Sequence, residues 1–162
     1  WPNDIYVDER KICGILIEQS FQSDYLSQTV IGIGLNVNQQ SFGHAPNATS
    51  MHLQLGCNHK LSLWCITKGV TRLTLAFYDI LQRCYPKTME TPAKQVRILA
   101  PFMRYYYLHL YHGEGHHLFR AGGETFTAHI VSVAPSGEIT LQTEQGQRRT
   151  YWFKEVEFVQ PE

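Results

Sequence analysis

The chain has 162 residues, of which 43% are hydrophobic and 17% are charged, an ordinary globular composition that suits one or two small domains. Its 14 basic and 14 acidic residues balance to a formal net charge of zero. Composition therefore gives no sign of a nucleic-acid or membrane partner, because either surface needs a clustered basic excess. The longest apolar runs fall well below the ~18 residues of a membrane-spanning helix.

The four cysteines stand singly along the chain, at Cys13, Cys57, Cys65 and Cys84. Without a CxxC pair, structural zinc and a disulfide framework are both disfavoured, and we expect a reducing, cytoplasmic location. The opening residues are polar and then strand-like, so they do not resemble a signal peptide. The chain begins at Trp1, and we expect it to be a fragment or a processed product.

The first part of the chain has the apolar alternation of strands. Ile5–Val7 and Lys11–Glu18 flank three charged residues, which predicts a hairpin. Phe21–Gln28 is polar and predicts a loop, and Thr29–Val37 is the third predicted strand. Glycine, proline and polar residues over Gln39–Ser50 predict an ordered loop.

Helical patterning begins at Leu61 and extends to Cys84. Its 3.6-residue apolar stripe predicts one face packed on a core. The stripe consists of Val70, Leu73, Ala76, Phe77, Ile80 and Leu81. Ser62 or Thr67 is a suitable N-cap, and Pro86 predicts the end of this helix.

A second helix is predicted within Ala93–Tyr111, with its firmer part beginning near Pro101 because proline is disfavoured in a helix interior. The run His112–His117 then breaks the pattern. Its adjacent histidines, His116 and His117, suit neither a helix-face pair nor a zinc spacing, so we expect a solvated linker between domains.

Beyond that linker the apolar period changes to two. The predicted strands are Phe119–Arg120, Thr125–Val133, Glu138–Thr143, Arg148–Phe153 and Val156–Val159. Short strands at this spacing, separated by Gly- and Pro-containing turns, predict a small barrel. We place the domain boundary so that residues 1–114 and 115–162 form the two domains.

The segment "VIGIGLNVN" has two unlike faces, because alternate residues of a strand share a side. Ile31, Ile33, Leu35 and Val37 form an apolar face, which we expect to be a buried wall, and Gly32, Gly34, Asn36 and Asn38 lie opposite. Glycine inside a strand marks a close approach to the backbone. A flat ligand across the glycines, hydrogen-bonded at its edge by Asn36, is one interpretation. A packed helix or a bulge is the other.

The predicted second strand repeats this arrangement. Ile12, Gly14 and Leu16 share a face. If the two strands are neighbours, their glycine faces join into one narrow apolar groove. Lys11 has the opposite parity, so it reaches the groove only if it lies in the turn before the strand. The alternative interpretation is that Lys11 is a solvated charge with no role in the groove. Asn3 and Asp4 after Pro2 are typical of a turn.

Taken together, "WPNDIYVDERKICGILIE", "VIGIGLNVN", the helical stretch and the β-rich end "YWFKEVEF" resemble a biotin–protein ligase, also called biotin–[acetyl-CoA-carboxylase] ligase. The resemblance covers the C-terminal half of the catalytic domain and the C-terminal SH3-like domain. It implies an α+β fold: a mixed sheet with helices, like that of class II aminoacyl-tRNA synthetases, followed by an SH3-like barrel.

The resemblance also implies an activity. The family joins biotin to ATP with Mg²⁺ present, forms biotinyl-5′-adenylate, and transfers biotin to a lysine of a biotin carboxyl carrier protein, in acetyl-CoA carboxylase or a related carboxylase. Lys11 matches the essential catalytic lysine. The implied biotin-binding residues are Lys11, Gly14, Leu16, Gly32, Gly34 and Leu35. The implied nucleotide-binding residues are Asn3, Asp4, Lys11 and Asn36, and Asp4 is also the candidate metal ligand.

The family's Gly/Arg-rich loop and the strand that binds the ureido group precede this segment. We therefore expect the 162 residues alone to be inactive or nearly so. A homodimer through sheet edges is a further possibility. Two other functions stay open: a related lipoate ligase or octanoyl transferase, and a non-catalytic fragment that binds a carrier protein.

Overall fold

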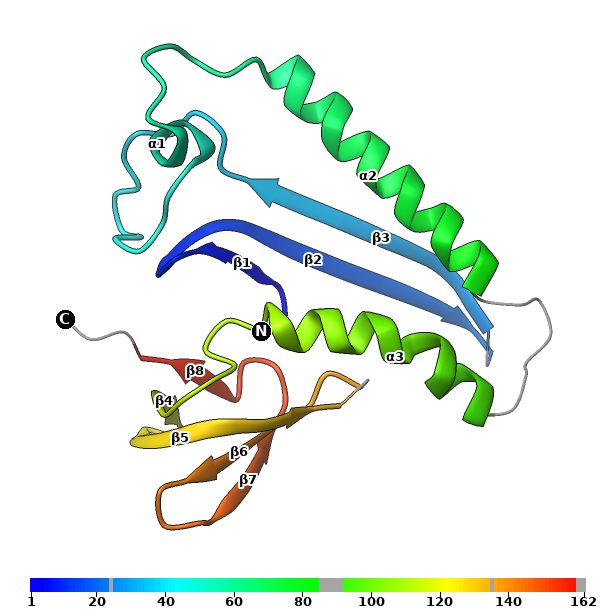
Figure 1. The fold of residues 1–162 in the computed structure, drawn as a ribbon, viewed down its shortest axis with the longest axis vertical. Coiled ribbons are helices and arrows are strands. Elements are labelled where there is room, and N and C mark those ends of the chain that lie inside the picture. Colours follow the sequence, from blue (N-terminus) through cyan, green and yellow to red (C-terminus); the bar gives the residue numbers. More distant parts are fainter. Residues whose placement is uncertain (24, 85–91, 135, 160–162) are drawn as a thin grey trace. The chain divides into compact units, whose positions relative to one another are not determined.

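The computed structural model describes residues 1–23, 25–84, 92–134 and 136–159. The chain divides into two compact units (Figure 1). One unit is Asn3–Ile98, and the other joins Trp1–Pro2 to Leu99–Glu162. The division falls inside a helix, and the domain boundary placed after Glu114 stays a prediction. Within the described ranges, no helix is both long and apolar enough to cross a membrane.

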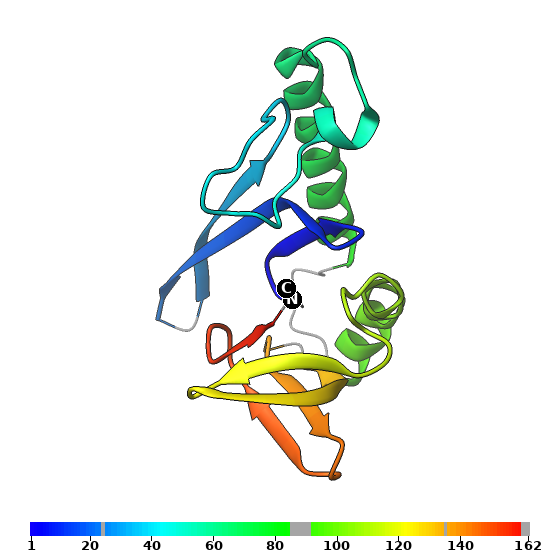
Figure 2. The ribbon, with the colours of Figure 1, turned by 90° about the vertical axis from the view of Figure 1, so that its left-hand side faces the viewer.

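The first unit is built on a three-stranded antiparallel sheet of β1 (Asp4–Val7), β2 (Arg10–Gln22) and β3 (Tyr25–Leu35), in the order β1-β2-β3 (Figures 1 and 2). The predicted hairpin and third strand are confirmed. The predicted loop over 21–28 is wrong, because β2 and β3 extend toward each other through it. Polar residues are tolerated there since the strand ends are exposed and paired: Ser20 lies opposite Gln28, and Ser27 Oγ donates to the Ser20 carbonyl at 2.9 Å.

A loop connects β3 to α1 (Met51–Leu55), a short helix that periodicity does not predict because five residues contain barely more than one turn. Ser50 is its N-cap and accepts a hydrogen bond from the Leu53 N–H, while Gly56 ends it in the left-handed conformation at φ 60°. Ser50 and the preceding Thr49 are both fully buried. The predicted loop before them is confirmed as an ordered one.

The helix α2 (Leu63–Cys84) runs along β3 in Figure 1, and the Cys65 N–H donates to Ser62 Oγ at 3.4 Å, which supports Ser62 as its cap. The predicted core-facing stripe is wrong for much of its length, since Leu73 and Phe77 are 72% and 48% exposed. The predicted end at Pro86 and the side chain of Leu81 lie outside the described residues.

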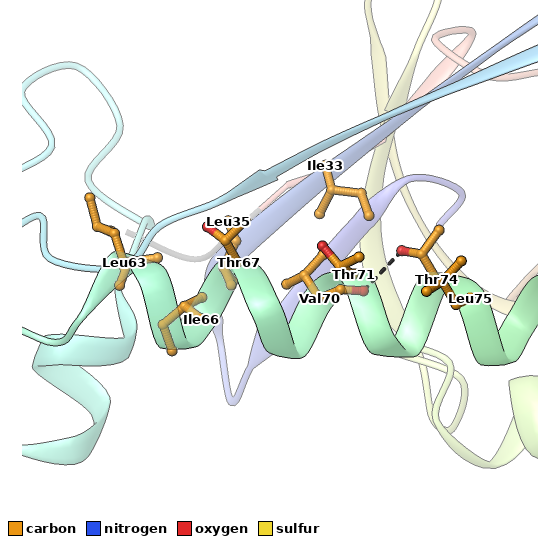
Figure 3. A pocket seen from close by; sticks show the side chains of 10 residues that line it. Ile33, Leu35, Leu63, Ile66, Thr67, Val70, Thr71, Thr74 and Leu75 are labelled. Carbon is orange, nitrogen blue, oxygen red and sulfur yellow. Dashed lines mark hydrogen bonds between the residues drawn. The ribbon is translucent and has the colours of Figure 1, made fainter.

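The face of α2 that meets β3 shares Val70 with the predicted stripe but is otherwise a different one, and a cavity of about 490 Å³ lies between α2 and β3 (Figure 3). Its lining is Ile33, Leu35 and Val37 from the strand side, and Leu63, Ile66, Thr67, Val70, Thr71, Thr74 and Leu75 from the helix. Val37 is buried as predicted, but Ile31 and Ile33 are exposed, so the predicted apolar wall is only partly buried. Apolar residues occupy more than one face of α2, and the three-stranded sheet covers only one of them.

The helix α3 (Pro92–Leu108) continues through Pro101, so the prediction that the firm helix begins at that proline is wrong. Proline removes one backbone N–H and crowds one carbonyl, and this local cost does not end the helix here. At its C-terminal end, Tyr107 is bonded twice to the second unit's sheet. Its hydroxyl accepts from the Val133 N–H at 2.9 Å and donates to the Val133 carbonyl at 3.0 Å.

The second unit contains a five-stranded antiparallel sheet in the order β7-β6-β5-β4-β8. The strands are β4 (His117–Ala121), β5 (Glu124–Val133), β6 (Ile139–Thr143), β7 (Arg148–Tyr151) and β8 (Val156–Phe158). All the predicted strands are confirmed. The predicted barrel is not, because the ladders between the described strands form an open sheet whose edges are β7 and β8.

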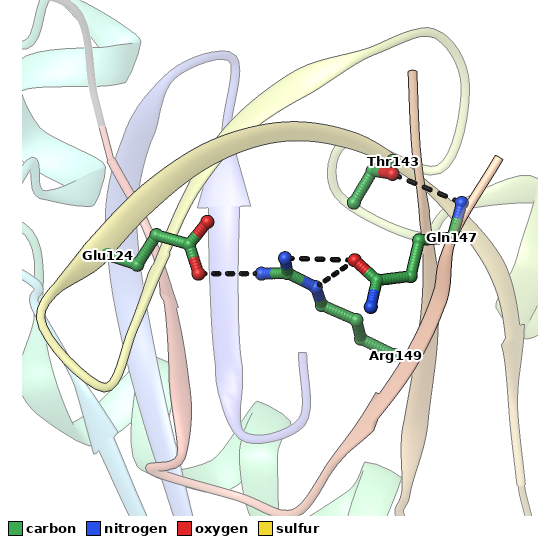
Figure 4. A network of polar contacts seen from close by, with 4 residues as sticks. All are labelled: Glu124, Thr143, Gln147 and Arg149. Carbon is green, nitrogen blue, oxygen red and sulfur yellow. Dashed lines mark hydrogen bonds and ion pairs between the residues drawn. The ribbon is translucent and has the colours of Figure 1, made fainter. Parts of the chain in front are cut away.

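This sheet buries a core of its own. Phe119, Ala128, Ile139 and Leu141 are at most 1% exposed, and Trp1 packs against their cluster while its indole N–H donates to the Gly137 carbonyl at 3.1 Å. On the surface, Arg149 joins Glu124 at 3.0 Å and Gln147 at 3.0–3.2 Å (Figure 4), and its guanidinium lies 4.7 Å from the Phe126 ring centroid. These contacts connect the start of β5 to β7.

Candidate active site

The glycines of the two motifs form one floor in the first unit. In the sheet register, Asp4 of β1 lies opposite Gly14 of β2, and Gly14 lies opposite Gly34 of β3. In the adjacent row, Leu16 lies opposite Gly32. The two glycine-bearing strands are therefore neighbours, as the groove hypothesis requires. A Cβ built on Gly34 would meet the Gly14 carbonyl at 3.6 Å, so the floor consists of backbone alone.

Lys11 reaches this floor by a route that the sequence did not predict. It lies in β2 itself and not in the turn. The register of β1 against β2 shifts between Ile5 and Tyr6: Ile5 pairs with Cys13 and Tyr6 with Lys11, which leaves Ile12 as an extra residue. This β-bulge reverses the parity of Lys11 relative to Gly14. A Cβ on Gly14 would lie 3.7 Å from Lys11 Cε and 3.8 Å from Lys11 Nζ.

Asp4 is the partner of this lysine. Lys11 Nζ and Asp4 Oδ2 are 2.8 Å apart, and their side chains are 41% and 33% exposed. Asp4 Oδ1 would also lie 3.7 Å from a Cβ on Gly14. The pair therefore stands over the glycine floor and stays accessible to solvent, so an anion can approach the ammonium group without a buried path.

Two groups next to this pair have raised pKa values, and burial is the largest cause for both. Burial raises the pKa of the Cys13 thiol, the charge of Asp4 raises it further, and Lys11 partly opposes them. Burial also raises the pKa of Tyr6, with further contributions from Asp4 and Glu9. Both the Cys13 thiol and the Tyr6 hydroxyl are therefore neutral at neutral pH.

The loop after β3 positions the backbone of Lys11. The Lys11 N–H donates to the Asn47 carbonyl, and the Lys11 carbonyl accepts from the Thr49 N–H, both at 2.8 Å. The Asn36 side-chain amide donates to the Thr49 carbonyl at 3.0 Å. Thr49 and Asn47 were not predicted from the sequence, and their one local signal was the N-cap Ser50, which marks an ordered loop before a helix.

The remaining candidate residues, Asn3, Asn36 and Leu35, do not all lie on the face of the glycine floor. The Asn3 carbonyl accepts from the Ile15 N–H at 2.7 Å, so its backbone joins the edge of the sheet next to Asp4. Asn36 lies at the end of β3, where its N–H donates to the Ile12 carbonyl at 2.9 Å. Leu35 does not join the others. It lines the cavity against α2, on the face opposite the glycines (Figure 3).

Asp4 is the candidate metal ligand. Within the described parts of the chain, no group of three or more His, Cys, Asp or Glu residues is arranged to hold a metal ion. A protein-only cage is therefore not present among these residues. Mg²⁺ commonly binds through one or two carboxylates together with substrate phosphates, and a single carboxylate beside the groove fits that mode.

Comparison with known proteins bears on the same segment. Residues 1–36 match the Biotin/lipoate A/B protein ligase family, and every candidate site residue lies within them. Over 154 residues the chain is 29% identical to the bifunctional ligase/repressor BirA of Bacillus spizizenii, covering 93% of this chain and 43% of that protein. BirA of Escherichia coli strain K12 is 46% identical over 37 residues, 23% of this chain and 12% of that protein.

Solved structures agree with the sequence matches. The apo structure of the biotin protein ligase from Aquifex aeolicus has a TM-score of 0.67 at 18% identity, covering 99% of this chain and 64% of that one. The resemblance to biotin–protein ligases is confirmed. The Aquifex aeolicus ligase in complex with biotin and ATP has a TM-score of 0.63 at 22% identity, covering 99% and 61%. The fold of the chain is a mixed α/β fold similar to that of these biotin–protein ligases.

The chain spans less than half the length of the BirA proteins of Bacillus that it matches, at 43% of each. Its likeness to BirA of Escherichia coli is confined to a stretch of 37 residues. The strands that carry the glycine floor, β1 to β3, lie within residues 1–36, where the family match lies.

Proposed function

We propose that this chain is part of an ATP-dependent ligase that attaches biotin to a lysine of a biotin carboxyl carrier protein. The observation that carries the proposal is Lys11 held over the Gly14–Gly34 floor by a β-bulge, within the segment that matches the ligase family. A floor without side chains admits a flat, largely apolar ligand such as the fused rings and valeryl chain of biotin. The ammonium group stands where that ligand's carboxylate can approach it.

The chemistry needs such a cation. In the first step a carboxylate oxygen of biotin attacks the α-phosphorus of ATP, and pyrophosphate leaves with the bonding electrons, giving biotinyl-5′-adenylate. Two anions must meet, and the transition state gathers further negative charge on the phosphoryl oxygens. A fixed ammonium group offsets both effects. Lys11 is therefore the proposed catalytic residue, and Mg²⁺ supplies additional positive charge at the phosphates, with Asp4 as its proposed ligand.

In the second step the amine of the carrier lysine attacks the acyl carbon of the adenylate. An amide forms, AMP leaves, and the proton of the attacking amine is lost to solvent or to a base. Lys11 then faces the phosphate of the departing AMP and stabilises its charge. Gly14, Gly32, Gly34 and Leu16 are the proposed biotin-binding surface, and Asn3 and Asn36 the proposed nucleotide-binding residues. The Leu35 side chain lies on the α2 face of β3, so it contributes to biotin binding only if β3 twists to bring that side chain to the glycine face.

The proposal extends to architecture and partners. We propose that the first unit is part of a class II synthetase-like catalytic domain, and that the five-stranded unit is an SH3-like domain. The catalytic domain would end at residue 114. A homodimer through a sheet edge is compatible with β1 and β3 being the outer strands of the sheet among the described residues. A lipoate ligase or octanoyl transferase activity is the second candidate, favoured by a family match that includes both biotin and lipoate ligases.

The test uses the longer gene product that contains this chain. The protein is incubated with MgATP, a carboxyl carrier domain, and biotin and lipoate in competition, and the carrier is weighed by mass spectrometry. We expect an increment of one biotin that is lost in Lys11→Ala and kept in Lys68→Ala, which removes an exposed lysine of α2.

Each other result has a definite meaning. A lipoyl increment would assign the protein to the sister branch of the family. No increment with either acid would reject the ligase proposal in favour of a carrier-binding fragment. The 162-residue chain is assayed beside the longer product, and full adenylate synthesis by it would contradict the expectation that it is inactive alone.

A further inference from the structure

We propose that His116 and His129, in the second unit, form a chelating site for a divalent transition metal. The site is separate from the groove of the first unit and takes no part in the proposed ligase reaction. His129 Nδ1 and His116 Nε2 are 3.3 Å apart, and the two rings meet nearly edge to face, with centroids 4.9 Å apart and an angle of 75°. The sequence pattern pairs His116 with its neighbour His117, whereas its partner in the structure lies 13 residues away.

The strand register explains why these two histidines meet. His117 of β4 pairs with Ala128 of β5 in an antiparallel ladder, so the next position outward places His116 opposite His129. Directly opposed residues of an antiparallel pair project to the same face, with Cβ atoms about 4.5–5.5 Å apart. His117 is engaged elsewhere: its ring nitrogen bonds the Glu114 carbonyl at 2.6 Å, and its ring stacks on His112 at 3.8 Å.

The spacing of the two nitrogens fits a chelate. Metal–imidazole bonds to Zn²⁺ are about 2.0–2.1 Å long, so two nitrogens 3.3 Å apart subtend roughly 105–110° at the metal, close to the tetrahedral angle. Imidazole is a preferred ligand for Zn²⁺, Cu²⁺ and Ni²⁺. Without metal, the N–H of one ring donates a hydrogen bond to the facing nitrogen of the other. To bind metal, the donor ring shifts to its other tautomer, so that its proton moves to the distal nitrogen and both facing nitrogens present lone pairs.

The site offers two protein ligands. Among the residues that the structure describes, no third His, Cys, Asp or Glu completes a set around them. His116 is exposed, so water can fill the remaining coordination positions. Such a site binds metal more weakly than a closed structural zinc site. Its consequence is a cross-link between the residue that precedes β4 and the middle of β5, which stabilises the folded second unit in proportion to metal occupancy.

The experiment titrates the tag-free 162-residue chain with ZnCl₂ by calorimetry, and with Cu²⁺ by electron paramagnetic resonance. We expect one Zn²⁺ per chain at this site, a raised thermal midpoint with metal, and a copper spectrum with two coordinated nitrogens. His116→Ala and His129→Ala should each lower the affinity at least tenfold and abolish the shift in midpoint. His59→Ala, which removes an exposed histidine of the first unit, is the matched control and should change neither.

The proposal is overturned if both variants bind Zn²⁺ as tightly as the unchanged chain, or if the copper spectrum contains one nitrogen. It is also overturned if His59→Ala weakens binding as much as they do, since that would indicate general surface binding. His129 lies inside β5, so its variant is checked for folding. If it does not fold, His116→Ala decides, because His116 is exposed and lies outside the strand.

Discussion

The two units of this chain use antiparallel sheets for different purposes. In the second unit the sheet folds around a core of its own, where Ile139 and Leu141 are completely buried. In the first unit Ile33 is 42% exposed, and one sheet face carries glycines in place of side chains. A glycine floor leaves room for the ligand proposed above but buries no apolar side-chain area, so the first sheet loses packing where the second gains it. The difference separates residues that stabilise the fold from residues that are proposed to bind the ligand.

The largest effect on stability is expected in the core of the second unit. Leu141→Ala should lower the free energy of unfolding by about 2–5 kcal/mol, because it leaves a cavity in a fully buried position. Urea denaturation measures this change. Leu73→Ala, at a position 72% exposed on α2, is the control and should stay within about 0.5 kcal/mol. Equal costs at the two positions would contradict the contrast between the units.

A change in the glycine floor should affect binding more than folding. In Gly14→Val, the added Cβ alone would lie 3.7 Å from Lys11 Cε and Asp4 Oδ1, and valine places two methyl groups beyond it. Valine itself favours a strand. In the longer gene product we expect biotin affinity to fall at least tenfold, a loss of about 1.4 kcal/mol or more, with the thermal midpoint little changed. Calorimetric titration with biotin checks this.

Gly69→Ala is the matched control for that experiment. Gly69 lies in α2 with open space around its Cα, so alanine should stabilise the helix by about 0.5–1 kcal/mol and leave biotin affinity unchanged. If Gly14→Val binds biotin normally, the floor is not the biotin surface, and the role proposed for these glycines fails.

A smaller effect on the free energy of unfolding is expected from the hydrogen bonds between Tyr107 of α3 and Val133 of β5. Tyr107→Phe removes the hydroxyl that bonds both backbone groups of Val133, and it should cost about 1–2 kcal/mol because those groups lose their partner. Chemical denaturation monitored by circular dichroism measures it. Tyr105→Phe, at a position 67% exposed, should cost much less. A neutral Tyr107→Phe would mean that water replaces the hydroxyl without loss.

The last prediction concerns the pH dependence of stability. Burial, and then the neighbouring Tyr107, raise the pKa of Tyr106 to about 12 from its ordinary value of 10. The folded pKa lies above the unfolded one, so this contribution to stability is fully present below pH 10 and is lost as pH rises from 10 to 12. Tyr106→Phe should therefore flatten the decline in stability over that range. Thermal midpoints across the range test this, and identical slopes would contradict it.

Much of the molecule was predictable from local pattern. Alternation predicted the opening hairpin, the third strand and all five strands of the second unit, and the 3.6-residue period predicted α2. Parity alone predicted the two glycine faces, the register of β2 against β3 makes them neighbours, and the motifs that carry them led to the ligase resemblance. These features depend on the spacing of apolar and glycine residues within one segment, which can be observed directly in the sequence.

Other features depended on contacts between segments. Three of these features depend on pairing across strands or between a strand and a loop. They are the bulge at Ile12 that brings Lys11 over Gly14, the hydrogen bonds of Lys11 with Asn47 and Thr49, and the contact of His116 with His129. A local pattern shows which side a residue takes within its own strand. The register of the assembled sheet decides which residue of another segment lies opposite. It also decides where one extra residue moves a side chain to the other face.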